Sequence, residues 1–85
     1  MLMPLPTEPA TLSASEIDEL NKQLSTMRHD INNHLSLVIA AVELIKHKPE
    51  MLQRMMSTLT EQPGRISQSV MKFSAEFEGA FQIHR

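Results

Sequence analysis

The fold is decided by residues 28–45, RHDINNHLSLVIAAVELI, in which a polar cluster runs directly into a long apolar segment. Upstream of this stretch the apolar residues recur every three or four positions and form one narrow stripe along a helix. From Leu35 to Ile45 they cover most of the helix circumference. The polar cluster therefore stands where one apolar pattern gives way to another.

The narrow stripe predicts one long first helix. Its spacing alternates between three and four, as in a heptad seam, through Ile17, Leu20, Leu24, Met27, Ile31, His34, Val38, Ala41 and Ile45. No glycine or proline interrupts this seam before Pro49. Ser13 and Glu16 fit a capping box, which is typical of a helix start. We therefore expect a helix over about residues 14–47.

A second helix is expected over about residues 50–83. Pro49 suits a first helical position, and the seam that follows is Leu52, Met56, Leu59, Pro63, Ile66, Val70, Phe73, Phe77 and Ala80. This seam keeps its phase across Pro63, which favours one helix kinked there over two separate helices. Prolines at positions 4, 6 and 9 predict that residues 1–12 form a flexible leader, outside the helical unit at 13–85.

Two helices of similar length joined by a tight turn predict an all-α, antiparallel two-helix hairpin. A hairpin has a single internal interface, so it cannot cover the all-round apolar surface of residues 35–45. A patch of this size is normally an association surface. We therefore expect a homodimer in which two hairpins form a four-helix bundle.

The composition narrows the possible classes of function. The net charge is −2 with mixed signs along the chain, so no basic stripe suggests a nucleic-acid partner. Cysteine is absent, which excludes thiolate metal sites and thiol nucleophiles. The longest apolar run, residues 37–42, is too short to span a membrane, and the first residues lack the basic charge of a secretory signal. The expectation is a cytoplasmic protein without a membrane segment.

The heptad positions separate two histidines of the polar cluster. With Ile31 at a core position, His29 falls at the outermost position of the heptad, and Asn33 stands one turn further on the same exposed face. His34 instead lies on the core seam, where we expect a buried or half-buried side chain that hydrogen-bonds across the dimer. The sequence thus predicts one histidine that faces water and one that faces the core.

Residues 28–35, RHDINNHL, resemble the H-box of sensor histidine kinases: a histidine, then an acid, two further residues and an asparagine or threonine, followed by an apolar run. The likeness extends in outline to residues 14–83, which look like the dimerisation and histidine-phosphotransfer domain of two-component signal transduction. A neutral imidazole is a good nucleophile near pH 7, so the chemistry is reasonable for an exposed histidine.

The resemblance implies a role for three residues. His29 would be the phosphoacceptor, Asp30 the acid that orients and deprotonates its ring, and Asn33 the residue that positions water in the reverse, phosphatase reaction. The implied partners are a second copy of the chain, an ATP-binding kinase domain in cis or trans, and a response-regulator receiver domain whose aspartate takes the phosphoryl group. ATP and Mg²⁺ are expected on these partner domains, and no cofactor is expected on this chain.

The chain departs from a complete kinase because it contains only two glycines and no nucleotide-binding motif. It is expected to be either a piece of a histidine kinase or a stand-alone phosphotransfer or phosphatase protein, and the sequence leaves both open. The four histidines are poorly placed for a metal, so no metal site is expected. The alternative is a purely structural helical dimerisation module, in which His29 is ordinary solvated surface.

Overall fold

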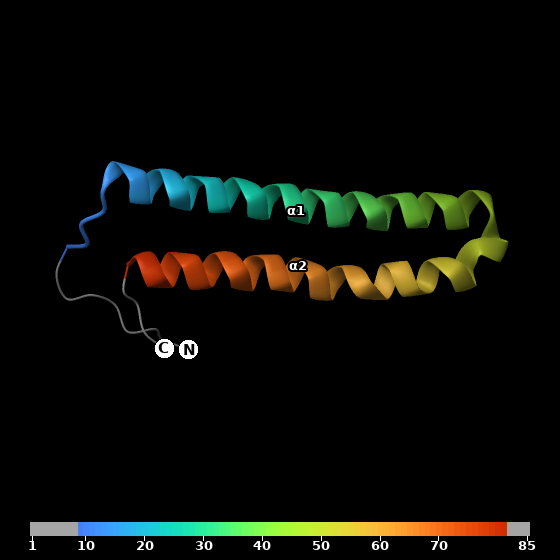
Figure 1. Cartoon of the computed structure of the whole chain (residues 1–85). Helices are drawn as coiled ribbons and strands as arrows, with labels where there is room; N and C mark the ends of the chain where they lie inside the picture. Colours follow the sequence, from blue (N-terminus) through green and yellow to red (C-terminus); the bar gives the residue numbers. More distant parts are fainter. Residues whose placement is uncertain (1–8, 82–85) are drawn as a thin grey trace.

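The computed structural model describes residues 9–81, which form two long antiparallel helices joined by a short turn (Figure 1). Helix α1 spans Ala14–His47 and helix α2 spans Leu52–Ala80, with a single 3-10 turn, η1, at Pro49–Met51 between them. The predicted all-α antiparallel hairpin is therefore confirmed. Most of the predicted leader, residues 1–8, lies outside the described residues, as does the end of the expected second helix after Phe81.

Helix α1 begins with the capping box that the sequence predicts. The Ser13 hydroxyl accepts a hydrogen bond from the Glu16 backbone N–H at 3.1 Å, and the Glu16 carboxylate accepts one from the Ser13 backbone N–H at 3.0 Å. The bond that the Ser13 backbone N–H donates to the carboxylate, and after it the nearby Ser13 side chain, hold the pKa of Glu16 below its ordinary value of 4.5. Two of the amides that a helix start leaves without partners are thereby satisfied.

Helix α2 runs without interruption across Pro63. Proline lacks the N–H that would bond to the carbonyl of Leu59, and its ring crowds that carbonyl, so it costs about 3 kcal/mol in an unsupported helix interior. The continuous helix excludes the alternative of two separate helices that meet at this proline. Packing against α1 on both sides of Pro63 is the compensation that the fold provides.

The helices pack through part of the two predicted seams. We call the packed residues that follow one heptad position the inner stripe; its side chains are half-buried or buried between the helices, and they are Leu20, Met27, His34 and Ala41 of α1 with Leu59, Ile66, Phe73 and Ala80 of α2. A hairpin has one contact direction, and a heptad seam is wider than one contact direction.

Exposed seam residues at the other heptad position form an outer stripe, although on α1 this position is half-buried from Ile31 onward. The outer stripe consists of Ile17 and Leu24 of α1 with Met56, Pro63, Val70 and Phe77 of α2. In an antiparallel pair, equivalent heptad positions fall on the same side of the interface, so the two helices present their outer stripes on one face of the hairpin. Nearer the turn, α1 adds four further exposed apolar side chains, Leu35, Leu37, Ile39 and Val42.

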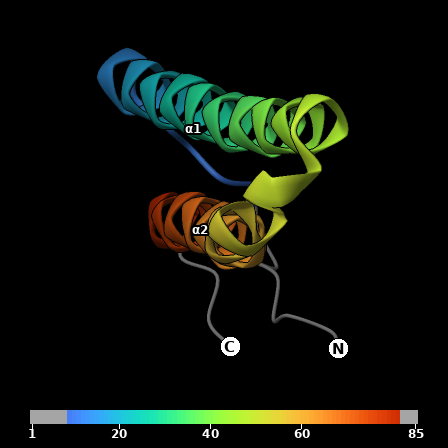
Figure 2. The ribbon, with the colours of Figure 1, turned by 90° about the vertical axis from the view of Figure 1, so that its right-hand side faces the viewer.

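The hairpin by itself has almost no interior. Among residues 9–81, only Ala41 and Gln62 are buried, each with 3% of its surface exposed. The molecule extends over 58 × 28 × 12 Å, and the end view shows α1 lying alongside α2, with no further layer formed by residues 9–81 (Figure 2). Within this described part, no helix has both the length and the apolar character that crossing a bilayer requires.

Candidate functional site

His29 lies near the middle of α1 with its side chain exposed. It follows Leu24 of the outer stripe by five residues, so at 3.6 residues per turn the two side chains point about 140° apart around the helix. The imidazole therefore points away from the apolar face. The next described residues on both sides of it continue the same helix without a break, so the backbone that carries the ring is rigid.

Asn33 is the hydrogen-bond partner of His29. It lies one helical turn further along α1, and its Nδ2 atom is 3.4 Å from the His29 Nδ1 atom. Both side chains are exposed. The spacing of four residues brings side chains together on one helix face, as the sequence predicts for this pair. The contact engages Nδ1 and leaves Nε2, the outer nitrogen of the ring, directed to solvent.

Asp30 is half-buried and lies on a different side of α1 from His29. It lines a small hollow between the helices together with Thr26 of α1 and Ser69, Lys72 and Phe73 of α2. Its carboxylate makes no hydrogen bond or ion pair with any other residue in the range 9–81. Consecutive helical residues point about 100° apart, which explains why Asp30 does not reach the neighbouring ring in this conformation.

His34 forms the one side-chain hydrogen bond that joins α1 to α2 in the described part of the chain. Its Nδ1 atom is 2.7 Å from the Gln62 Oε1 atom. We expected this histidine to bond across the dimer; instead its partner is in the same hairpin. His34 is half-buried and Gln62 is 3% exposed, so the pair lies between the helices, with His34 on the inner stripe and Gln62 beside it.

Gln62 is a residue that the sequence reasoning missed. Its side chain also donates from Nε2 to the Thr58 carbonyl at 3.0 Å, so both ends of the amide have partners. A signal for it does exist in the sequence, because His34 and Gln62 are equally distant from Lys48 at the turn and hence level with each other in a hairpin.

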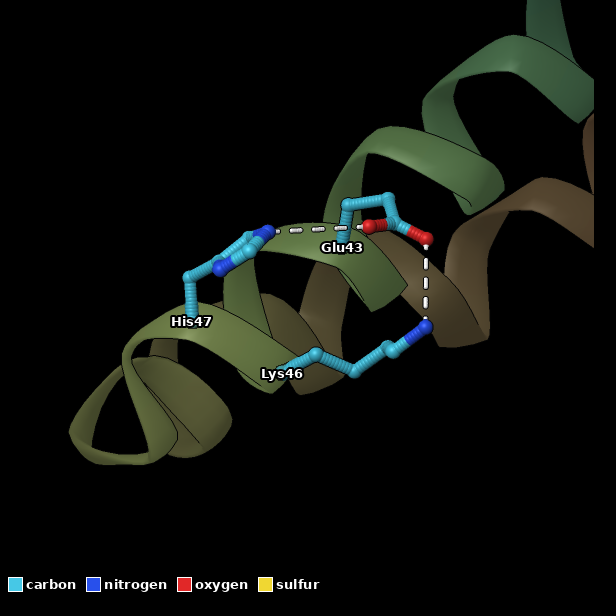
Figure 3. A network of polar contacts seen from close by, with 3 residues as sticks. All are labelled: Glu43, Lys46 and His47. Carbon is cyan, nitrogen blue, oxygen red and sulfur yellow. Dashed lines mark hydrogen bonds and ion pairs between the residues drawn. The ribbon is translucent and has the colours of Figure 1, made fainter.

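A third histidine, His47, lies in the last turn of α1 and, among the histidines of residues 9–81, is the one that has a carboxylate beside its ring. Figure 3 shows Glu43 between Lys46 and His47, with its two oxygens directed one to each side chain. The His47 Nε2 atom is 3.8 Å from Glu43 Oε2, and the Lys46 Nζ atom is 3.5 Å from Glu43 Oε1. Cations suit the negative end of a helix dipole, so this cluster stabilises the end of α1.

No group of three His, Asp or Glu side chains in the range 9–81 lies close enough together to hold a metal ion. A hollow beside the inner stripe lies at the open end of the hairpin, where its lining includes Glu16, Glu19, Leu20, Glu76 and Ala80. It is distant from His29 along α1. The His29–Asn33 pair is therefore a surface site on a single helix, open to a large partner.

The resemblance of residues 28–35 to an H-box is carried by those residues and by the exposed position of the His29 ring. Comparison with protein-family models, with curated proteins and with solved structures finds no match for this chain.

Proposed function

We propose that this chain is a dimerisation and histidine-phosphotransfer domain of a two-component system, with His29 as the phosphoacceptor. The observation that carries the proposal is the placement of this imidazole. It is exposed at the middle of a rigid helix, it points away from the apolar face, and a hydrogen-bonding asparagine lies one turn away. A partner protein has free access to such a ring.

The proposed reaction needs little from this chain beyond positioning. A ring nitrogen of His29 attacks the γ-phosphorus of ATP held by a kinase domain, and the bond to ADP breaks. In the second step an aspartate oxygen of a receiver domain attacks the same phosphorus, and the P–N bond to the histidine breaks. Phosphoryl transfer depends mainly on alignment and on charge neutralisation, which the partner supplies with its ATP and Mg²⁺.

Asp30 and Asn33 take the supporting roles that the family resemblance implies. Asn33 is already on the His29 face, where an amide is suitably placed to orient a water molecule in the reverse reaction. Asp30 would serve as the orienting acid after a change of rotamer, which a docking partner can induce because the carboxylate has no other side-chain partner in residues 9–81.

We further propose that two hairpins associate as a homodimeric four-helix bundle through the outer stripe. Large apolar side chains such as Ile17, 56% exposed, and Val70, 42% exposed, line one face of a hairpin that has only two buried residues of its own in the described range. Fully burying a side chain of this kind contributes about 1.5–3 kcal/mol, and the part that is still exposed here contributes roughly half of that. A second copy is the occupant whose surface repeats the same heptad spacing.

The two parts of the proposal are mutually consistent. Because His29 points about 140° away from Leu24, pairing through the outer stripe leaves both phosphoacceptors of the dimer on the outside. A receiver or kinase domain then docks against the bundle without separating the helices.

The function is tested by following a phosphoryl group. The full chain is treated with phosphoramidate, a small phosphoryl donor for imidazoles, and then mixed with each receiver domain encoded in the same genome in the presence of Mg²⁺. The expected result is an acid-labile, base-stable phosphoryl group on His29 that passes to the aspartate of a receiver. The His29→Gln variant should lose the transfer, whereas His47→Gln, which removes another exposed histidine of α1, should retain it.

A second arm supplies ATP together with each histidine-kinase catalytic domain of that genome. If the chain is only a structural dimerisation module, no kinase domain will label His29 and no receiver will remove a phosphoryl group placed there chemically. That outcome would overturn the proposed function. The dimer is tested separately by light scattering, in which a monomer at micromolar concentration would contradict the four-helix bundle.

A further inference from the structure

In two histidines of α1 the same ring atom, Nδ1, contacts the amide of another side chain. A second hydrogen bond fixes the orientation of one of these amides but not of the other. The Gln62 amide beside His34 is fixed, because its Nε2 donates to the Thr58 carbonyl and only its Oε1 faces the ring, at 2.7 Å. An oxygen there can only accept a hydrogen bond, so His34 must carry its proton on Nδ1.

The Asn33 amide beside His29 has no such second partner in residues 9–81, and in the observed conformation its Nδ2 atom is the one that faces the ring, at 3.4 Å. An NH₂ group can only donate. The contact therefore suits an imidazole that has a lone pair on Nδ1 and its proton on Nε2. Turning the amide over would present Oδ1 instead and would suit the other tautomer.

We propose that Asn33 is a positioning residue that holds the free hairpin's His29 in the tautomer protonated on Nε2, and so keeps the outer ring nitrogen unreactive until the amide turns. A neutral imidazole attacks phosphorus through the nitrogen that has the lone pair. With the proton on Nε2, that lone pair is on Nδ1, where Asn33 covers it. With the amide reversed, Nδ1 holds the proton and Nε2 is free to attack.

This inference rests on the proposed function for its biological meaning, but the tautomer itself is measured without any partner. Long-range ¹⁵N–¹H correlation spectra of the full chain report which ring nitrogen of each histidine is protonated. They are recorded at a pH high enough that the ring ¹⁵N shifts no longer change with pH. We expect His34 to show its proton on Nδ1 and His29 to show it on Nε2. His34 thus serves as an internal reference in the same spectrum.

Three variants test the role of the amide. Asn33→Ala removes it, Asn33→Asp replaces it with a group that only accepts, and Asn32→Ala changes an exposed asparagine next to it as the matched control. A hydrogen bond at this long distance has a small effect, so Asn33→Ala should raise the Nδ1-protonated fraction of His29 by about two- to three-fold. Asn33→Asp should raise it further, and Asn32→Ala should leave it unchanged.

The reactivity of Nε2 should follow the same order. In the reaction with phosphoramidate, Nε2 attacks phosphorus, the P–N bond of the donor breaks, and ammonia leaves as ammonium with the proton that the ring gives up. The initial rate of labelling at Nε2 of His29 should rise by about two- to three-fold in Asn33→Ala, in proportion to the reactive tautomer. The rate should be unchanged in Asn32→Ala.

Equal tautomer fractions in the native chain and Asn33→Ala would overturn the inference, as would a fall of the Nδ1-protonated fraction in Asn33→Ala. Failure of the proposed function looks different. In that case the tautomer and the labelling rate respond to Asn33 as described, but no receiver accepts the phosphoryl group.

Discussion

The inner and outer stripes are both mainly apolar and have the same heptad spacing, yet only the inner stripe is packed. On the inner stripe, Met27 and Phe73 lie between the helices, and Ala41 is almost completely covered. On the outer stripe, Leu24, Val70 and Phe77 remain exposed. The difference leaves the hairpin with an uncovered apolar face, which suggests an oligomerisation partner.

The stripes also differ in polarity. The inner stripe contains a histidine that is bonded to a buried glutamine on the flank of the other helix, and such a polar pair gives a specific register to an otherwise apolar contact. The outer stripe contains only Ile, Leu, Met, Val, Phe and Pro side chains. The contact between α1 and α2 thus includes a specific hydrogen bond, whereas the outer stripe offers a partner only shape and apolar area.

The largest effect is expected from a charge on the outer stripe. In Val70→Asp, each dimer would bury two carboxylates that are too short to reach water along an apolar face. We expect the dissociation constant of the dimer to rise by at least about a hundred-fold, equivalent to about 3 kcal/mol or more. Sedimentation velocity over a dilution series measures the change.

The matched control is Met71→Asp, which places the same charge one residue further along α2. Met71 is 68% exposed and does not belong to the outer stripe. Met71→Asp should leave the dissociation constant of the dimer nearly unchanged. If Val70→Asp and Met71→Asp raise this constant equally, the outer stripe is not the surface through which two copies associate.

The next effect concerns the polar pair on the inner stripe. Gln62→Leu deprives the His34 Nδ1–H of its acceptor at a half-buried position. Leaving such a donor without a partner costs about 1–3 kcal/mol. The melting temperature should therefore fall, by roughly 4–8 °C for each kcal/mol in a domain of this size.

The double variant His34→Leu with Gln62→Leu isolates the interaction. Replacing both partners by apolar groups removes the unsatisfied donor, so the double variant should melt above Gln62→Leu. If the double variant melts below Gln62→Leu, the unsatisfied His34 donor is not the cause of the destabilisation in Gln62→Leu.

A smaller effect is expected from Gly64, which lies in α2 but belongs to neither stripe. Gly64 is exposed within α2, and a Cβ added there meets nothing within 4 Å. Gly64→Ala should therefore stabilise the hairpin by about 0.5–1 kcal/mol, measured by urea unfolding. Gly79→Ala, next to the end of α2, should have less effect. A destabilised Gly64→Ala variant would mean that the helix needs this glycine beside Pro63.

The smallest effect is expected at the start of α1, away from both stripes. Because the pKa of Glu16 is lower in the folded chain, its ionised form stabilises the cap above pH 4.5, and this contribution is lost as the pH falls through the folded-state pKa. Glu16→Gln should remove that part of the pH dependence. Thermal melts of both proteins between pH 3 and pH 7 measure it; parallel curves would contradict the assignment.

The sequence predicts the helices well because their signals are local. The cap depends on Ser13 and Glu16, which are three residues apart, and the reversal depends on Pro49 and on the uninterrupted periodicity on each side. Which seam residues form the inner stripe and which form the outer stripe could not be predicted. That choice depends on how the two helices rotate against each other, and apolar residues of nearly equal size on adjacent positions do not determine the rotation.

The candidate site divides in the same way. The exposure of His29 and its contact with Asn33 follow from helical spacing alone. The partner of His34 does not, because Gln62 is distant in the sequence and polar, and neither the seam nor the family resemblance marks it. The side-chain direction of Asp30 depends on a rotamer, which spacing leaves open.

Among residues 9–81 the interior of the hairpin is one alanine and one glutamine, so the proposed dimer would make the folded state depend on the protein concentration. Where two copies supply each other's core, folding becomes a second-order process, and the folded fraction falls on dilution. The supply of the proposed phosphoacceptor in the cell would then respond more than linearly to its synthesis, since an unpaired copy unfolds more readily and is then open to proteases. Gene dosage would thereby set a threshold below which the signal has no carrier.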